Sequence, residues 1–134
     1  MWYKKSYIMK ILLTLFVLLF SSSVVAEWIY FSTNEGGYDY YYDDQTIKKN
    51  NDHIFFWRLS DYNKKDQFGD MSVITYHKLD CSNFRYVWLN SKYYDQPMGE
   101  GKLNADENYE DWKYPKPGSI GYSIMNHICI KYNN

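Results

Sequence analysis

The 134-residue sequence has few of the residues from which catalytic and metal sites are usually built. It contains two cysteines, three prolines and three histidines, and the histidines lack the paired spacing of a zinc site. Neither a glycine-rich phosphate loop nor a cofactor motif is present. The run Gly118-Ser119-Ile120-Gly121 does not have the spacing of a nucleophile elbow, so Ser119 is better explained as a helix cap. We therefore expect no catalytic activity and no bound cofactor or metal ion.

A hydrophobic run long enough to span a membrane is also missing. The apolar residues 11–20 are fewer than the about 20 residues that cross a bilayer core. They follow a basic start with three lysines, and Val24 and Ala26 then occupy the two small-residue positions that cleavage requires. This pattern predicts a signal peptide at residues 1–26 and a domain at residues 27–134 that is periplasmic, secreted or on the cell surface. A membrane anchor is the alternative interpretation.

Positive charge is scarce in the predicted domain. Residues 27–134 keep 12 of the 15 Lys and Arg and all 16 Asp and Glu, which gives a formal net charge of −4. Nucleic acid binding needs a basic face to meet the phosphates, so we expect no nucleic acid partner. Aromatic residues are abundant instead, with four tryptophans, fourteen tyrosines and five phenylalanines in the domain. This composition fits β-strands, and it is also typical of protein-binding surfaces.

The hydrophobic pattern predicts several strands and one helix. Strands are expected at residues 27–32, 38–43, 53–62, 71–81 and 84–94. A C-terminal helix is expected because Ile120, Ile124 and Ile128 recur every four residues and form one apolar side. The segment 95–118 is expected to be a long loop. We predict an α+β fold, with a single antiparallel β-sheet of about five to six strands and a C-terminal helix packed on one face.

The two cysteines, Cys81 and Cys129, have a single pairing available to them. Cys81 ends a predicted strand, and Cys129 lies on or beside the apolar side of the predicted helix. A disulfide between them would tether the helix to the sheet, and the oxidising compartment of an exported protein favours it. Two buried free thiols are the alternative.

Side-chain alternation in the predicted strands also indicates a binding surface. Residues with the same parity as Cys81 would face the helix, and His77, which is one of them, is interpreted as a core histidine rather than a ligand. The opposite side of the sheet would then be exposed. The candidate binding face on that side comprises Phe56, Arg58, Tyr76 and Lys78. Aromatic and arginine side chains on an exposed sheet are typical hot spots of protein interfaces.

Several short motifs follow one another in an order that resembles a known family. They are Tyr41-Tyr42-Asp43 with Thr46-Ile47, Phe56-Trp57-Arg58-Leu59, Asp80-Cys81 followed by Arg85, Pro97-Met98-Gly99 with Gly101, Trp112, and Pro117-Gly118-Ser119 before the helix with Cys129. Over essentially the whole mature chain the sequence resembles the surface-adhesin protein E family. The resemblance implies a small antiparallel sheet with a C-terminal helix held to one face by a Cys81–Cys129 bridge. It also implies packing roles for Trp57 and Trp112.

The resemblance further implies a role in adhesion. The named member of the family is an outer-surface adhesin that resembles a lipoprotein, whereas this chain has no cysteine near residue 26 that could be lipidated. We therefore expect an exported, non-enzymatic protein-interaction module of the bacterial envelope, whose partner is an extracellular or envelope protein. The alternatives are an envelope-structural protein and a periplasmic protein that binds a small ligand between helix and sheet or beneath the loop around Trp112. A homodimer formed through an exposed edge strand is a further expectation.

Overall fold

The structure is a computed structural model that describes residues 2–18 and 26–133 of the chain. Helix α1 (Trp2–Leu18) falls within the predicted signal peptide. Val24, one of the two residues of the predicted cleavage site, lies outside the described residues. In the described part of the chain, no helix has the length and apolar character that crossing a membrane requires.

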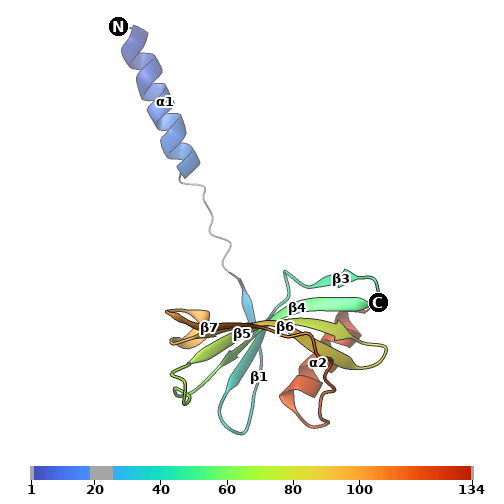
Figure 1. Ribbon diagram of the computed structural model, residues 1–134. Coiled ribbons are helices and arrows are strands. Elements are labelled where there is room, and N and C mark those ends of the chain that lie inside the picture. Colours follow the sequence, from blue (N-terminus) through green and yellow to red (C-terminus); the bar gives the residue numbers. More distant parts are fainter. Residues whose placement is uncertain (1, 19–25, 134) are drawn as a thin grey trace.

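One antiparallel sheet of seven strands forms the body of the domain (Figure 1). Neighbouring strands pair in the order β1-β2-β4-β5-β6-β7, and β3 pairs with β4 beside this path. The elements are β1 (Trp28–Thr33), β2 (Asp39–Asp43), β3 (Lys48–Asn50), β4 (His53–Asp61), β5 (Ser72–Asp80), β6 (Arg85–Tyr94), η1 (Pro97–Gly99), β7 (Leu103–Asn108) and α2 (Ile120–Tyr132). The predicted α+β architecture is confirmed, with more strands than the five to six expected.

Of the two additional strands, β3 lies between the predicted strands 38–43 and 53–62, and β7 lies in the segment that was expected to be a loop. All three residues of β3 and five of the six residues of β7 are exposed. Each strand pairs with one neighbour, β3 with β4 and β7 with β6. Because hydrophobic periodicity reports burial, it does not detect polar strands that are held by backbone pairing and polar side-chain contacts instead of apolar packing.

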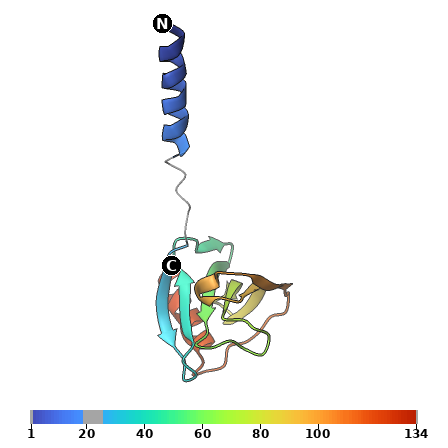
Figure 2. The same ribbon diagram turned by 90° about the vertical axis from the view of Figure 1, so that its left-hand side faces the viewer.

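Helix α2 packs on one side of the sheet (Figures 1 and 2). It begins where the sequence predicted, because the Ser119 hydroxyl accepts a hydrogen bond of 3.1 Å from the Tyr122 N–H. The helix and the sheet share one buried cluster, formed by Tyr42, Ile54, Phe56, Leu79, Ile124, Met125 and Ile128. We call the side of the sheet that α2 covers the helix face.

A disulfide joins Cys81, directly after β5, to Cys129 in α2, with the two Cα atoms 5.7 Å apart. This confirms the predicted pairing. The helix is therefore held on the sheet both by apolar packing and by a covalent bond at the β5–β6 turn.

The short helix η1 packs on the opposite side of the sheet, at the ends of β4 and β5. The Gly99 N–H donates to the Ser72 hydroxyl at 2.8 Å, and the Met98 N–H donates to the Asp61 carboxylate at 3.1 Å. Gly99 has a φ of +72°, and its Cα approaches the side chain of Ile74 too closely to leave room for a Cβ. The motif Pro97-Met98-Gly99 thus brings the backbone of η1 close to β4 and β5, within a segment that was expected to be a loop.

Candidate functional site

The register between β4 and β5 decides which predicted site residues share a face. Directly opposed residues of antiparallel strands point to the same side, and the register pairs Phe56 with His77. Phe56 is fully buried and stacks on His77 with ring centroids 4.8 Å apart. Arg58, two residues further along β4, points to the same side. The prediction that Phe56 and Arg58 cluster with Tyr76 and Lys78 away from the helix was therefore wrong.

The physical reason is that alternation fixes the two sides of each strand but not the phase between two strands. That phase depends on the length and conformation of the connecting segment. In this protein the connection between β4 and β5 brings Phe56 and Arg58 to the helix face, where Phe56 becomes part of the core.

Tyr76 and Lys78 lie on the opposite side together with Phe55 and Trp57, and we call this set of four half-buried side chains the open face. Trp57 stacks on Tyr76 with centroids 4.5 Å apart, and Phe55 lies 6.0 Å from Tyr76. The Lys78 ammonium is 5.3 Å from the centroid of Trp112. The open face is therefore a row of contacting aromatic rings with a cation at one end.

An ion pair stabilises the cationic end of the open face. Arg85 Nε donates to Asp80 Oδ2 at 2.9 Å, and the Arg85 guanidinium lies 4.2 Å from the centroid of Trp112. Burial raises the pKa of Asp80, but hydrogen bonds from Asn83 and Arg85 outweigh that effect and lower the pKa to about 2. Asp80 is therefore ionised at neutral pH and holds the guanidinium beside Trp112.

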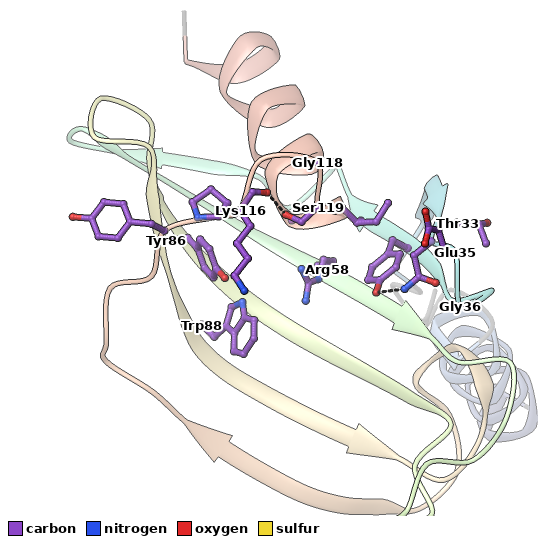
Figure 3. A pocket seen from close by; sticks show the side chains of 15 residues that line it. Thr33, Glu35, Gly36, Arg58, Tyr86, Trp88, Lys116, Gly118 and Ser119 are labelled. Carbon is purple, nitrogen blue, oxygen red and sulfur yellow. Dashed lines mark hydrogen bonds between the residues drawn. The ribbon is translucent and has the colours of Figure 1, made fainter.

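A cleft opens on the helix face where α2 no longer covers the sheet (Figure 3). Its volume is about 780 Å³, and it lies between β2, β4, β6, the loop after β1 and residues 114–121. An adjoining cavity of about 220 Å³ shares Tyr40, Arg58 and Trp88 with it. We call the combined space the Arg58 cleft.

Arg58 projects from β4 into this cleft without a charged partner. Its guanidinium carbon lies 5.7 Å from the centroid of Tyr40, and its Nε is buried with no hydrogen-bond partner. Among the residues that the structure describes, Arg85 and Asp80 form the one ion pair, so no carboxylate neutralises Arg58. Burial lowers the pKa of Arg58, because the site disfavours its charged form.

Two other residues with unpartnered buried polar atoms, His77 and Trp88, lie near Arg58 on the same side of the sheet, whereas Asn90 is paired with Tyr76 on the open face. Within residues 2–18 and 26–133, the buried side-chain atoms that lack a hydrogen bond are Arg58 Nε, both ring nitrogens of His77, Trp88 Nε1 and Asn90 Oδ1. His77 and Trp88 are directly paired across β5 and β6. Burial, with a further contribution from the Arg58 charge, lowers the pKa of His77 well below its ordinary value. His77 is thus a neutral core histidine.

Lys116 and Glu35 are the other charged residues that line the cleft. The Lys116 side chain extends from the segment before α2 into the cleft beside Trp88 (Figure 3). The lining therefore carries two cations and one acid. In the described part of the chain, no group of His, Cys, Asp and Glu is arranged to hold a metal ion.

Sequence reasoning did not find Trp88 or Lys116 as site residues. The sequence placed Trp88 on a predicted strand at residues 84–94. It did not show that α2 leaves this part of the sheet uncovered, because the position of the helix on the sheet results from tertiary packing. The same holds for Lys116, which lies outside all regular elements and enters the cleft only because the chain turns back before α2.

Comparison with known proteins identifies the family. A family model described as Surface-adhesin protein E matches residues 28–130. The chain belongs to the surface-adhesin protein E family. The match covers every strand and all but the end of α2, so the sheet, the disulfide and both candidate surfaces lie within the family's domain.

Solved structures of Haemophilus influenzae protein E have the same fold as this chain. The selenomethionine form is 18% identical with a TM-score of 0.65, and the alignment covers 84% of this chain and 96% of that one. A second crystal form is 21% identical with a TM-score of 0.65, covering 84% and 94%. A further structure of protein E is 21% identical with a TM-score of 0.63, covering 82% and 89%. No curated protein matches the sequence.

Proposed function

We propose that this member of the surface-adhesin protein E family is an exported, non-enzymatic adhesin-like module that binds a partner protein through its open face. Membership of the family supports an adhesin-like surface protein. The observation that carries the choice of surface is the half-buried row of Phe55, Trp57 and Tyr76 with Lys78 at its end. The partner is an extracellular or envelope protein.

Two physical arguments favour the open face over the helix face. Large aromatic side chains bury much apolar area with few rotatable bonds, so they contribute strongly to binding when a partner covers them. The contacts between Trp57 and Tyr76, and between Lys78 and Trp112, hold these side chains in place before binding. Less conformational entropy is then lost when the complex forms.

The test is a binding measurement on residues 27–134 with two substitutions on the open face, Trp57→Ser and Tyr76→Ser. Purified extracellular-matrix and serum proteins, immobilised for surface plasmon resonance, serve as the candidate partners. A partner bound by the wild type should bind each variant with at least about tenfold lower affinity, since interface aromatics of this kind contribute about 2 kcal/mol or more.

Phe68→Ser is the matched control, because Phe68 is an aromatic residue with 74% of its surface exposed and lies in the β4–β5 connection. It should leave the affinity unchanged. Thermal unfolding of each variant shows whether the domain is still folded. Equal binding by the wild type and both folded open-face variants would exclude the open face as the binding surface.

The proposed location at the bacterial surface or in the periplasm requires export, for which the predicted signal peptide would provide the address. In α1, Ile8, Ile11 and Leu13 are among several large apolar side chains that are exposed, as expected for a segment that a translocation machinery recognises. We expect the mass of the protein recovered from an exporting cell to correspond to a chain that begins at Glu27. A mass that includes residues 1–26 would contradict cleavage of a signal peptide.

A further inference from the structure

We propose that the Arg58 cleft is a second binding site, which takes a small organic acid with its carboxylate at Arg58 and its apolar body against Trp88 and Tyr86. The site lies on the side of the sheet opposite the open face, so it is independent of the protein-binding surface proposed above.

The first argument is the uncompensated charge of Arg58. Removing part of a cation from water is costly unless an anion or several acceptors surround it, and Arg58 is half-buried with its Nε fully buried. Arg85, on the other side of the sheet, has the Asp80 carboxylate at 2.9 Å, whereas Arg58 has a buried Nε without an acceptor. Its guanidinium can donate two parallel hydrogen bonds to a planar carboxylate, which is the geometry that arginine recognises best.

The second argument is the grouping of unused donors around Arg58. Trp88 Nε1, a donor that cannot accept, is buried without a partner, and Lys116 extends into the cleft beside the Trp88 ring (Figure 3). Buried polar groups in folded proteins are nearly always hydrogen-bonded. A ligand that supplies acceptors, rather than donors, would satisfy this cluster.

The third argument is the size and lining of the cavity. The larger of its two parts, with a volume of about 780 Å³, lies in the range of small-molecule sites, which are about 300–1,000 Å³ and are walled mainly by apolar and aromatic groups. Tyr40, Tyr86 and Trp88 provide such walls on either side of Arg58. The single acid of the lining, Glu35, and the net charge of −4 of residues 27–134 disfavour polyanions, so a ligand with one carboxylate fits best.

The experiment compares two probes of nearly the same shape, the anion naphthaleneacetate and the neutral naphthaleneacetamide, in which an NH₂ donor replaces one acceptor oxygen. Binding to residues 27–134 is measured by isothermal titration calorimetry at pH 7. We expect the acid to bind about 10- to 100-fold more tightly than the amide, which is the usual range for a charge-assisted hydrogen bond in place of a neutral one. Equal affinities of the two probes, or no binding of either, would overturn the proposal.

Two substitutions of matched chemistry locate the site. Arg58→Met should abolish the preference for the acid over the amide, whereas Arg85→Met, on the opposite side of the sheet, should preserve it. If Arg58→Met does not fold, Lys116→Gln is the second variant, and it should reduce the preference by about two- to fivefold because its cation is solvent-exposed. An unchanged preference in the folded Arg58→Met variant would overturn the proposal.

The tryptophans provide an independent readout in the wild type. Trp88 lies in the cleft, whereas Trp57 and Trp112 lie on the other side of the sheet. Addition of naphthaleneacetate should shift the indole N–H resonance of Trp88, assigned with a Trp88→Phe variant, and leave those of Trp57 and Trp112 in place. Shifts confined to Trp57 or Trp112 would show binding on the open face and contradict the assignment.

Discussion

His77 occupies the middle of β5 with 2% of its surface exposed. Neither ring nitrogen has a hydrogen-bond partner in the described part of the chain, and one ring face is stacked on Phe56. Protonation would place a second positive charge beside Arg58 with no acceptor for the new N–H. The folded state therefore favours neutral histidine, and the pKa of His77 is lowered by burial and by the Arg58 charge.

This shift predicts a loss of stability in mild acid. Below about pH 6.5 the unfolded chain binds a proton at His77 that the folded protein does not, so the free energy of unfolding falls as the pH decreases. The expected slope is up to about 1.4 kcal/mol per pH unit between pH 6.5 and 5, and the full stability is present above pH 6.5. Urea unfolding of residues 27–134 at several pH values measures how the free energy of unfolding depends on pH.

The His77→Phe variant tests the assignment, because it keeps the stacked ring and removes the titrating group. Its stability should depend much less on pH over the same interval, whatever its stability at pH 7. His127 also has a pKa lowered by burial, so His127→Gln should remove a further part of the pH dependence. An unchanged slope in His77→Phe would show that another group is responsible.

At the scale of elements, η1 and the segment before α2 each contain a glycine with a positive φ, for different reasons. Gly99 has a φ of +72° and faces Ile74, whose Cγ1 would be 3.1 Å from an added Cβ and whose Cδ1 would be closer. Gly118 has a φ of +82°, but no atom within 4 Å of such a Cβ. Backbone conformation requires glycine at both positions, whereas close packing requires it only at Gly99.

We predict that Gly99→Ala destabilises the domain more than Gly118→Ala. In both variants alanine must adopt a left-handed backbone conformation, which costs about 1–2 kcal/mol of stability. Gly99→Ala must also displace Ile74, which adds about 1–3 kcal/mol as in other overpacked sites. The free energies of unfolding from urea titration measure the difference. Equal losses in the two variants would show that the η1 contact with the sheet is loose.

At the scale of the whole molecule, the disulfide links two elements that are distant in the sequence and that pack in the same core. Cys81 and Cys129 are separated by 48 positions, and the bridge joins the β5–β6 turn to the last helix. A bond across such a loop removes conformations from the unfolded chain, and the chain-entropy estimate is about 4 kcal/mol. This is a large share of the about 5–15 kcal/mol by which domains of this size are stable.

We therefore predict that the Cys81→Ala/Cys129→Ala double variant loses about 3–5 kcal/mol in its free energy of unfolding. The measurement is urea unfolding at pH 7. Wild-type protein treated with dithiothreitol is the control, and it should show a similar loss. A loss below about 1 kcal/mol would mean that apolar packing of α2 alone holds the helix on the sheet.

Local patterns in the sequence were sufficient for the elements whose burial alternates. The helix at α2 follows from Ile120, Ile124 and Ile128 with the Ser119 cap, and the bridge follows from the position of the only two cysteines. The polar strands β3 and β7 did not follow, because backbone pairing without burial leaves no hydrophobic period.

The site depended on relations between elements that no local pattern contains. The alternation of β4 and of β5 was visible in the sequence, yet the register between them placed Phe56 and Arg58 on the helix face and left Tyr76 and Lys78 on the other. Helix α2 then covered Phe56 but stopped short of Arg58, which left a cationic cleft beside the core. Periodicity determines which residues of one strand are buried together, whereas register and helix placement result from packing over the whole domain.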